Sequence, residues 1–368
     1  MHFFKRSLFF AVCMASALKN AAAYSIDNAG GLLDKAGKPM HFKGISWFGL
    51  ETPDLAPNGC WVNSMKFYMD TLATEGFNVL RVPFSAQWIL YHFDAYPDMG
   101  FVSADPMNQH KKSIEILDNL FAMAQERNIL ILLDLHRLDW GFISELWYDR
   151  YNSAFTEETF FTTWYKILDR YHDHPALWGV DLLNEPHGAA EWGSGNPATD
   201  WHQFAEHAIH EIEKRYENAT WVYMVEGVGW GKELQNAIVS PVVPPASAKN
   251  RVALSAHNYG ASVVPSTDMS TWGLHNDWDN HFGQVRKQGS SVIIGEWGGR
   301  VDVDAGWMNS FVDYLIDTNT TDAFFWSLGP NSGDVGGYLL DDWTSVDEFK
   351  RGVTTRLQPN PVPVPRVP

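Results

Sequence analysis

Short apolar runs alternate along this chain with longer segments in which apolar residues recur every three or four positions. We expect the apolar runs to be strands, and eight of them follow one another from about residue 41 onward. They are His41–Phe48, Asn78–Ser85, Ile129–His136, Leu177–Glu185, Thr220–Glu226, Arg251–Tyr259, Ser291–Trp297 and Ala323–Ser327. Several are almost continuously apolar, which is typical of parallel strands that are buried on both faces.

The segments between these runs carry the period of an amphipathic helix. Predicted helices cover Met107–Arg127, Thr156–Tyr171 and Trp201–Tyr216. In the last of these, Trp201, Phe204 and Ala208 fall on one face. Thr156 can cap the middle helix, and the two glutamates that follow it place negative charge in the first turn, where the helix dipole favours it.

Eight strands alternating with helices predict a (β/α)8 TIM barrel, an α/β fold. The alternative is an open, doubly wound sheet, but no glycine-rich dinucleotide fingerprint follows the first strand. The segment Tyr24–Met40 precedes the barrel, and Gly30 and Gly31 mark a turn within it. We therefore expect a short N-terminal hairpin beneath the barrel.

The two ends of the chain differ from the part between them. Residues 1–23 have a charged start at Lys5 and Arg6, an apolar stretch too short to span a bilayer, and a small-residue site that ends at Ala23. We predict a secretory signal peptide cut after Ala23; the alternative is an uncleaved anchor. One barrel domain would then cover residues 24–357, followed by a Pro-rich disordered tail, QPNPVPVPRVP, over residues 358–368.

Two further features agree with secretion. Glycosylation sequons stand at Asn218 and Asn319. Of the two cysteines, Cys13 would leave with the signal peptide, so Cys60 remains alone and no internal disulfide framework is expected.

Charge and aromatic content narrow the class of partner. The formal net charge is −17 for all 368 residues and becomes −20 once the three basic residues of the signal are removed. Such a chain is repelled by nucleic acids and by anionic membranes, whereas a neutral polymer carries no such penalty. The sequence contains 17 Trp, and flat sugar faces stack on indole rings; the alternative use of these residues is core packing.

Two of the predicted strands carry a glutamate at or next to the carboxyl end, followed closely by a residue that breaks the strand. Glu185 is followed by Pro186, which cannot continue a sheet ladder, and Glu296 is followed by a break at Gly298. In parallel-sheet folds the chemistry lies at the carboxyl ends of the strands. The two carboxylates are therefore expected to face each other across the barrel mouth, and such a pair is the minimum equipment for cleaving a glycosidic bond.

Other polar and aromatic side chains gather at or near strand ends. They are Arg81, His136, His257, Tyr259 and Trp326. Asp134 and Asp181 lie inside apolar strands and are interpreted as buried partners of Arg or His. The pairs His172/His174 and His207/His210 lack a third ligand, so neither a metal nor a cofactor is expected.

Taken together, these residues resemble glycoside hydrolase family 5, and most closely its endo-β-1,4-glucanases, the cellulases. The likeness covers roughly residues 25 to 355. It is carried by the strand-end residues above and by five stretches: GISWFGLET (44–52), ALWGVDLLNEPH (176–187), VEGV (225–228), NRVALSAHNY (250–259) and SGDVGGYLLDDW (332–343).

The resemblance implies a secreted, monomeric, retaining enzyme that hydrolyses internal bonds of a β-glucan. Glu296 would be the nucleophile, and Glu185 the general acid and then the base, with carboxyl groups about 5–5.5 Å apart. The pKa of Glu185 would be raised, and that of Glu296 lowered mainly by Arg81.

The remaining site residues would bind the substrate. Asn184 is expected to bond the sugar 2-hydroxyl, Tyr259 to donate to Glu296, and His136 and His257 to bind hydroxyls. An open groove floored by Trp47, Trp230 and Trp326 is expected, with a cis peptide bond after Trp326. Rival functions are a β-1,3- or mixed-linkage glucanase, a xyloglucanase, a mannanase, or a non-catalytic glycan-binding protein.

Overall fold

The computed structural model describes residues 23–265 and 270–358. The predicted signal peptide, except for its last residue, and all but Gln358 of the predicted tail lie outside these residues. The strands of the larger sheet are β3 (Lys43–Ser46), β4 (Val79–Ser85), β5 (Leu130–Arg137), β6 (Leu177–Asp181), β7 (Val222–Glu226), β8 (Val252–Tyr259), β9 (Val292–Gly298) and β10 (Ala323–Phe325). Each falls within a predicted run or within one residue of it.

These strands form a closed parallel barrel in sequence order, in which β10 pairs with β3 to complete the ring. The prediction of a (β/α)8 barrel is therefore confirmed. One boundary was wrong: β6 ends at Asp181, so Asn184 and Glu185 follow the strand and do not lie in it.

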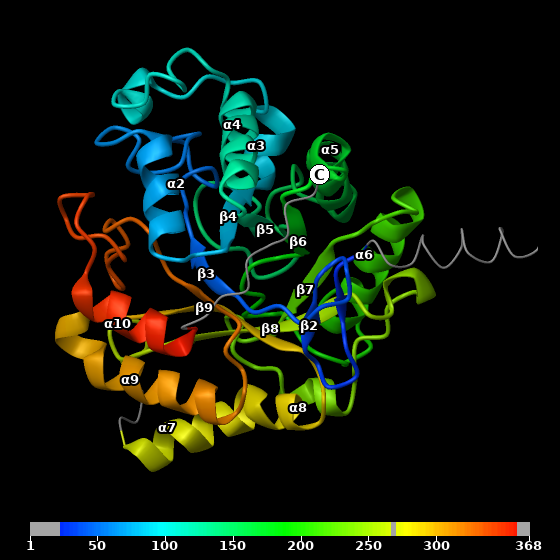
Figure 1. The fold of residues 1–368 in the computed structure, drawn as a ribbon. Coiled ribbons are helices and arrows are strands. Elements are labelled where there is room, and N and C mark those ends of the chain that lie inside the picture. Colours follow the sequence, from blue (N-terminus) through cyan, green and yellow to red (C-terminus); the bar gives the residue numbers. More distant parts are fainter. Residues whose placement is uncertain (1–22, 266–269, 359–368) are drawn as a thin grey trace, which may run out of the picture.

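Helices surround the barrel. They are α2 (Met65–Thr74), α3 (Ala86–Tyr91), α4 (Ser113–Glu126), α5 (Glu157–Tyr171), α6 (Trp201–Arg215), α7 (Thr271–Trp278), α8 (Gln284–Lys287), α9 (Val301–Asp317) and α10 (Glu348–Leu357), with short helical turns η1 (Met99–Val102), η2 (Gln235–Ile238), η3 (Ala246–Ala248) and η4 (Asp279–Gly283). Figure 1 shows α2 to α5 along one side of the strands and α7, α9 and α10 along the opposite side. No helix in the described ranges is long and apolar enough to cross a membrane.

The amino-terminal end of the barrel is closed by the predicted hairpin. Its strands β1 (Ser25–Ile26) and β2 (Leu32–Leu33) pair antiparallel. The backbone N–H groups of Tyr24 and Ile26 donate to Thr220 O at 3.0 Å and Asn250 O at 2.8 Å, next to the starts of β7 and β8. Tyr24 and Leu32 of this segment also pack in one apolar cluster with Phe42 and Trp178, so the hairpin lies against the amino-terminal end of the barrel.

Aromatic rings fill the lower barrel interior. Phe42 packs edge-on against Trp178, with ring centroids 4.5 Å apart, and also contacts Phe324 at 5.9 Å. Nine tryptophans are almost completely buried: Trp88, Trp147, Trp164, Trp178, Trp201, Trp221, Trp278, Trp297 and Trp307. Core packing therefore accounts for most of the Trp content.

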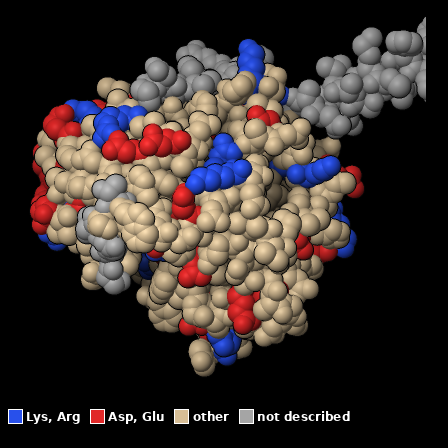
Figure 2. Space-filling model, turned by 90° about the horizontal axis from the view of Figure 1, so that it is seen from below, with Lys and Arg blue, Asp and Glu red and all other residues tan. Residues whose placement is uncertain are grey.

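Charged side chains are sparse on one face of the molecule (Figure 2). On the face shown in Figure 2, Asp and Glu side chains alternate with small groups of Lys and Arg, and most of the area is uncharged.

We predict that Thr156→Ala lowers the free energy of unfolding by about 1 kcal/mol, because Thr156 caps α5. Its Oγ1 accepts the N–H of Thr159 at 3.3 Å, and its own N–H donates to Thr159 Oγ1 at 2.7 Å. Urea denaturation measures the change. Thr162→Ala, on the exposed middle of the same helix, is the matched control and should leave stability within about 0.5 kcal/mol; equal losses in both variants would contradict the capping role.

Candidate active site

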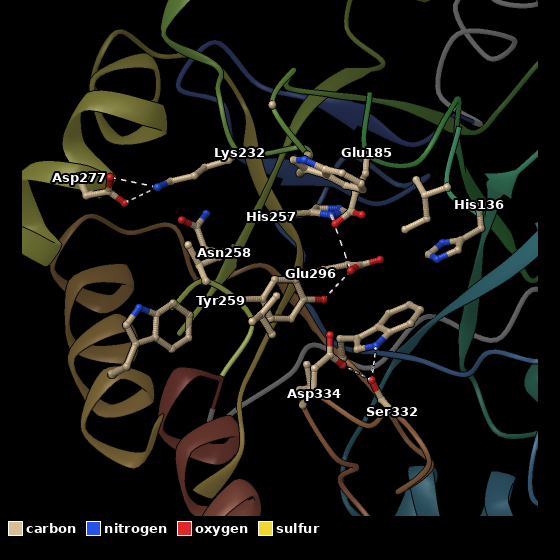
Figure 3. A pocket seen from close by; sticks show the side chains of 18 of the residues that line it. His136, Glu185, Lys232, His257, Asn258, Tyr259, Asp277, Glu296, Ser332 and Asp334 are labelled. Atoms are coloured by element: carbon tan, nitrogen blue, oxygen red, sulfur yellow. Dashed lines mark hydrogen bonds and ion pairs between the residues drawn. The ribbon is translucent and has the colours of Figure 1, made fainter. Parts of the chain in front are cut away.

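A cleft of about 630 Å³ opens at the carboxyl ends of the barrel strands. Both predicted glutamates line it, together with His136, His257, Asn258, Tyr259, Trp230 and Trp326. Figure 3 shows Glu185, His257 and Glu296 pointing toward one another, with Tyr259 beside Glu296. One carboxylate oxygen of Glu185, one of Glu296 and one nitrogen of His257 all lie within 4.8 Å of each other.

The position of Glu185 depends on an unusual backbone. Its φ angle is +50°, in the left-handed region that residues with side chains seldom adopt. Its N–H donates to Glu226 Oε2 at 2.7 Å, and its Oε1 lies 3.1 Å from His257 Nδ1. The residue is 8% exposed, so its carboxyl group is largely shielded but open to the cleft.

Glu296 lies within β9 and is held from two sides. The guanidinium of Arg81 forms a short ion pair with Oε1. The hydroxyl of Tyr259 donates to Oε2 at 2.5 Å. Both oxygens are therefore oriented and stabilised as the ionised form.

The two glutamates have opposite pKa shifts. Burial raises the pKa of Glu185 above its ordinary value, and the charges of Glu296 and Glu226 add to this, against the bond from His257. Burial also disfavours ionised Glu296, but His257 and then Arg81 outweigh it, so the pKa of Glu296 is lowered. Both pKa shifts have the directions predicted from the sequence. However, His257, and not Arg81, contributes most to lowering the pKa of Glu296.

His257 is positively charged over an extended pH range. Burial disfavours the imidazolium, yet the charges of Glu226 and Glu296 outweigh it and raise the pKa of His257 well above its ordinary value. Since His257 Nδ1 lies 3.7 Å from Glu296 Oε2, this charge acts directly on the predicted nucleophile.

Arg81 is completely buried and contacts several groups at once. Its nitrogens lie 3.1 Å from Asp134 Oδ2 and 3.2 Å from Asp181 Oδ2, and donate to Asn184 Oδ1 at 2.8 Å. Asp134 also contacts His136 Nδ1 at 2.7 Å. The interpretation of Asp134 and Asp181 as buried partners of Arg or His is confirmed.

Asp181 is a buried carboxyl group beside Arg81 whose pKa shifts in the opposite direction to that of Glu296. Burial raises the pKa of Asp181 well above its ordinary value, and the charge of Glu226 adds to this, while Arg81 opposes it.

Sequence reasoning missed Glu226. Its Oε1 lies 3.2 Å from both Arg81 Nη2 and His257 Nε2, and its Oε2 accepts the N–H of Glu185. One buried carboxylate therefore joins three groups of the site. The signal was available, because Glu226 is the last residue of the predicted strand Thr220–Glu226, but the stretch VEGV served only to support the resemblance.

Trp326 forms one wall of the cleft. Its ring is parallel to those of Phe48, at 5.5 Å, and His136, at 5.2 Å, and its Nε1 donates to Ser332 Oγ at 3.2 Å. The peptide bond from Trp326 to Ser327 is cis, as expected.

The three tryptophans expected in the groove differ in exposure. Trp230 lines the cleft and is 53% exposed. Trp47 does not line it: its side chain is 2% exposed, its Nε1 donates to Asn58 O at 2.8 Å, and its ring packs on Tyr68. Trp47 is therefore a core residue, and its assignment to the groove floor was wrong.

Asn184 has a free donor group. Its Oδ1 is occupied by Arg81, while its buried Nδ2 has no hydrogen-bond partner. The Nδ2 group is thus available to a ligand hydroxyl, consistent with the expected contact to the sugar 2-hydroxyl.

Among the described residues, Glu185, His257 and Glu296 form the one set close enough to ligate a metal ion.

A closed parallel barrel with two glutamates at its mouth, of opposite pKa shift, defines the class of barrel glycosidases. A family model described as "Cellulase (glycosyl hydrolase family 5)" matches residues 33–332. The chain therefore belongs to glycosyl hydrolase family 5 and is a glycoside hydrolase.

Individual relatives agree with this assignment. The chain is 37% identical over 350 residues to an endoglucanase of Paenibacillus polymyxa, covering 89% of this chain and 85% of the relative. It is 34% identical to the major extracellular endoglucanase of Xanthomonas campestris pv. campestris, covering 94% of this chain and 73% of the relative.

Solved structures give the same result. The catalytic domain of the Xanthomonas campestris enzyme superimposes with a TM-score of 0.84, covering 92% of this chain and 100% of that domain at 34% identity. A variant endocellulase from Pyrococcus horikoshii, solved in complex with cellotetraose, superimposes with a TM-score of 0.82, covering 91% of this chain and 98% of that chain at 31% identity.

We predict that Glu226→Gln moves the acidic limb of the kcat/KM–pH profile to higher pH. Glu226 is the largest charge that keeps His257 protonated, and protonated His257 in turn lowers the pKa of Glu296. With His257 neutral, Glu296 needs a higher pH to ionise. The other charged groups facing Glu226 are Arg81 and Asp181, and they remain.

The basic limb should move less, because Glu226 raises the pKa of Glu185 while His257 lowers it, and the two losses oppose each other. Glu213→Gln is the matched control. Glu213 is also buried and pairs with Arg251, but it lies on α6 outside the cleft. An acidic limb that stays in place in Glu226→Gln, or moves equally in both variants, would contradict the role of Glu226.

Proposed function

We propose that this chain is a secreted, retaining endo-β-1,4-glucanase that hydrolyses internal bonds of cellulose or related β-glucans. The observation that carries the proposal is the pair Glu185 and Glu296, with oxygens within 4.8 Å and pKa values shifted in opposite directions. Inverting glycosidases need about 6.5–9.5 Å between the carboxyl groups to admit a water molecule. The observed approach supports direct attack by one carboxylate.

In the first step, ionised Glu296 attacks the anomeric carbon and the bond to the leaving oxygen breaks. Glu185, protonated because its pKa is raised, gives its proton to that oxygen. Arg81 and Tyr259 hold Glu296 in position before the attack, since each contacts a different carboxylate oxygen.

In the second step, Glu185 has lost its proton and acts as a base toward a water molecule. The water oxygen bonds to the anomeric carbon, and Glu296 leaves as a carboxylate. The free amide of Asn184 is available to the sugar 2-hydroxyl, whose hydrogen bond strengthens in the transition state. Trp326 supplies a flat apolar surface beside the reacting sugar.

The substrate assignment rests on the relatives. Two curated relatives at 34–37% identity are named endoglucanases, and a relative of known structure was solved with cellotetraose. Mixed-linkage glucan, β-1,3-glucan, xyloglucan and mannan are the alternative substrates, and the experiment below tests all of them except xyloglucan.

Secretion and domain limits belong to the same proposal. We infer a signal peptide over residues 1–23, a catalytic domain over residues 24–357 and a Pro-rich tail over residues 358–368. A relative is named an extracellular endoglucanase. Both sequon residues, Asn218 and Asn319, are exposed and so are accessible to glycosylation.

We expect the purified protein to release short oligosaccharides rapidly from carboxymethylcellulose and barley glucan, and far more slowly from laminarin and mannan. Chromatography of the products, together with the loss of viscosity, measures both linkage and internal cleavage. Preference for mannan or laminarin would overturn the proposed substrate. Binding without cleavage of any polymer would identify a glycan-binding protein instead.

Glu296→Gln should abolish turnover without changing the circular dichroism spectrum, whereas Glu217→Gln, at an exposed site after α6, should keep full activity. In Glu296→Gly, azide should restore cleavage and give a glycosyl azide of inverted configuration, because the small anion occupies the space of the missing carboxylate. Full turnover in Glu296→Gln would exclude Glu296 as the nucleophile.

A further inference from the structure

Asp304, near the start of α9, is a buried carboxylate that none of the catalytic steps above uses. The residue is completely buried, although an acidic side chain is seldom enclosed unless its oxygens are bonded. Its oxygens accept the hydroxyl of Ser262 in a short hydrogen bond, the backbone N–H of Ser262 at 3.3 Å and the backbone N–H of Arg300 at 3.2 Å. Ser262 follows β8 and Arg300 follows β9, so one carboxylate joins two loops at the carboxyl end of the barrel.

This carboxylate lies where β8 and β9 separate. Tyr259 and Gly298 are the last paired residues of the two strands, and soon after them come Gly260 and Gly299. A Cβ atom added to Gly260 would lie 2.4 Å from Asp304 Oδ1, and one added to Gly299 would lie 2.6 Å from Asp304 Cβ. No side chain fits at either distance. Asp304 therefore packs directly on the backbone that leaves both strands.

The bonds of Asp304 also hold a turn that forms part of the cleft wall. The backbone N–H groups of Val263 and Val264 donate to Gly260 O at 3.1 Å and 2.9 Å. Both valines line the cleft, and Ser262 lies in the same turn. Through Ser262, the turn is fixed to the start of α9.

The two strands that Asp304 joins carry the nucleophile and one of its two hydrogen-bonding partners. Tyr259 on β8 donates its hydroxyl to Oε2 of Glu296 on β9 at 2.5 Å, and Figure 3 shows the two side chains side by side. This bond helps to keep the pKa of Glu296 low. A hydrogen bond of this length requires close control of the donor position, which depends on how the two strand ends are held together.

We propose that Asp304 is a positioning residue that holds the hydroxyl of Tyr259 on the nucleophile. It acts by fixing the end of β8 against the end of β9, through its bonds to Ser262 and Arg300. The inference rests on the proposed function, in which Glu296 attacks the anomeric carbon.

The first test replaces Asp304 with an amide of the same shape. In Asp304→Asn, the amide nitrogen cannot accept an N–H or O–H, so at least one bond to the loops is lost. The value of kcat/KM on an aryl β-cellobioside, normalised to folded enzyme by circular dichroism, should fall about tenfold. Asp302→Asn is the matched control, because Asp302 lies in the same helix but is exposed and pairs with Arg300. It should leave the rate unchanged.

The second test asks whether the effect passes through Tyr259. In a Tyr259→Phe background the hydroxyl is already absent, so adding Asp304→Asn should cause little further loss. A variant that merely loosens the barrel would lose activity to the same extent with or without the hydroxyl. Equal losses in the two backgrounds would therefore overturn the inference.

The pH profile gives an independent readout. Asp304→Asn should move the acidic limb of kcat/KM to higher pH, because Glu296 loses a donor that favours its ionised form. Removing the negative charge of Asp304 would by itself lower the pKa of Glu296, so the opposite shift reports the displaced hydroxyl. The other titratable groups that face Glu296 are unchanged in this variant: Arg81, His136, Glu185 and His257. An acidic limb that stays in place or moves to lower pH would contradict the proposal.

A milder variant covers the case in which Asp304→Asn does not fold. Ser262→Ala removes one donor to Asp304 and should show the same dependence on Tyr259, with a loss of about threefold. Failure of the proposed function is recognised separately, because the unmodified enzyme would then leave the aryl cellobioside intact or Glu296→Gln would keep its turnover. The same variants are in that case compared on the glycan that the enzyme does cleave.

Discussion

The site depends on one guanidinium group that is completely enclosed by acids and an amide. Arg81 contacts Asp134, Asp181, Glu226 and Glu296 without any exposure to solvent. Removing one partner of a buried ion pair typically costs about 3–5 kcal/mol, because the remaining charge has neither water nor a counter-ion. The carboxylates come from four different strands, so Arg81 fixes the relative positions of β5, β6, β7 and β9 at the level where the chemistry occurs.

This arrangement also separates the ionisation of two neighbouring glutamates. Glu296 contacts Arg81 and lies near His257, and both lower its pKa. Glu185 receives only the His257 contact and otherwise faces burial and the charge of Glu296, so its pKa rises. The difference arises from the charges around each carboxyl group, since the two side chains are chemically identical: His257 and then Arg81 lower the pKa of Glu296, whereas burial and the charges of Glu296 and Glu226 raise that of Glu185.

Much of the fold could be predicted because the eight strands are buried on both faces and stand out as apolar runs. Glu185 and Glu296 could be found because each stands at or next to the carboxyl end of such a run. The role of His257, the link through Glu226 and the burial of Trp47 could not be predicted in the same way. They depend on which side chains meet across the barrel, and the side chain of Trp47 is directed to Asn58 and Tyr68, outside the cleft. A strand pattern gives the end at which a residue lies but not the neighbour it meets.

The closed strand order has a consequence for how activity can be divided. The first four barrel strands carry Arg81 and lead to Glu185, while the last four carry His257 and Glu296. A chain cut between β6 and β7 leaves neither fragment with both carboxyl groups. By the proposed mechanism neither fragment alone hydrolyses the substrate, and hydrolysis regained on mixing them requires that β6 pairs with β7 and β10 with β3. The barrel is therefore suited to fragment complementation, because hydrolysis depends on assembly of the complete ring of eight strands.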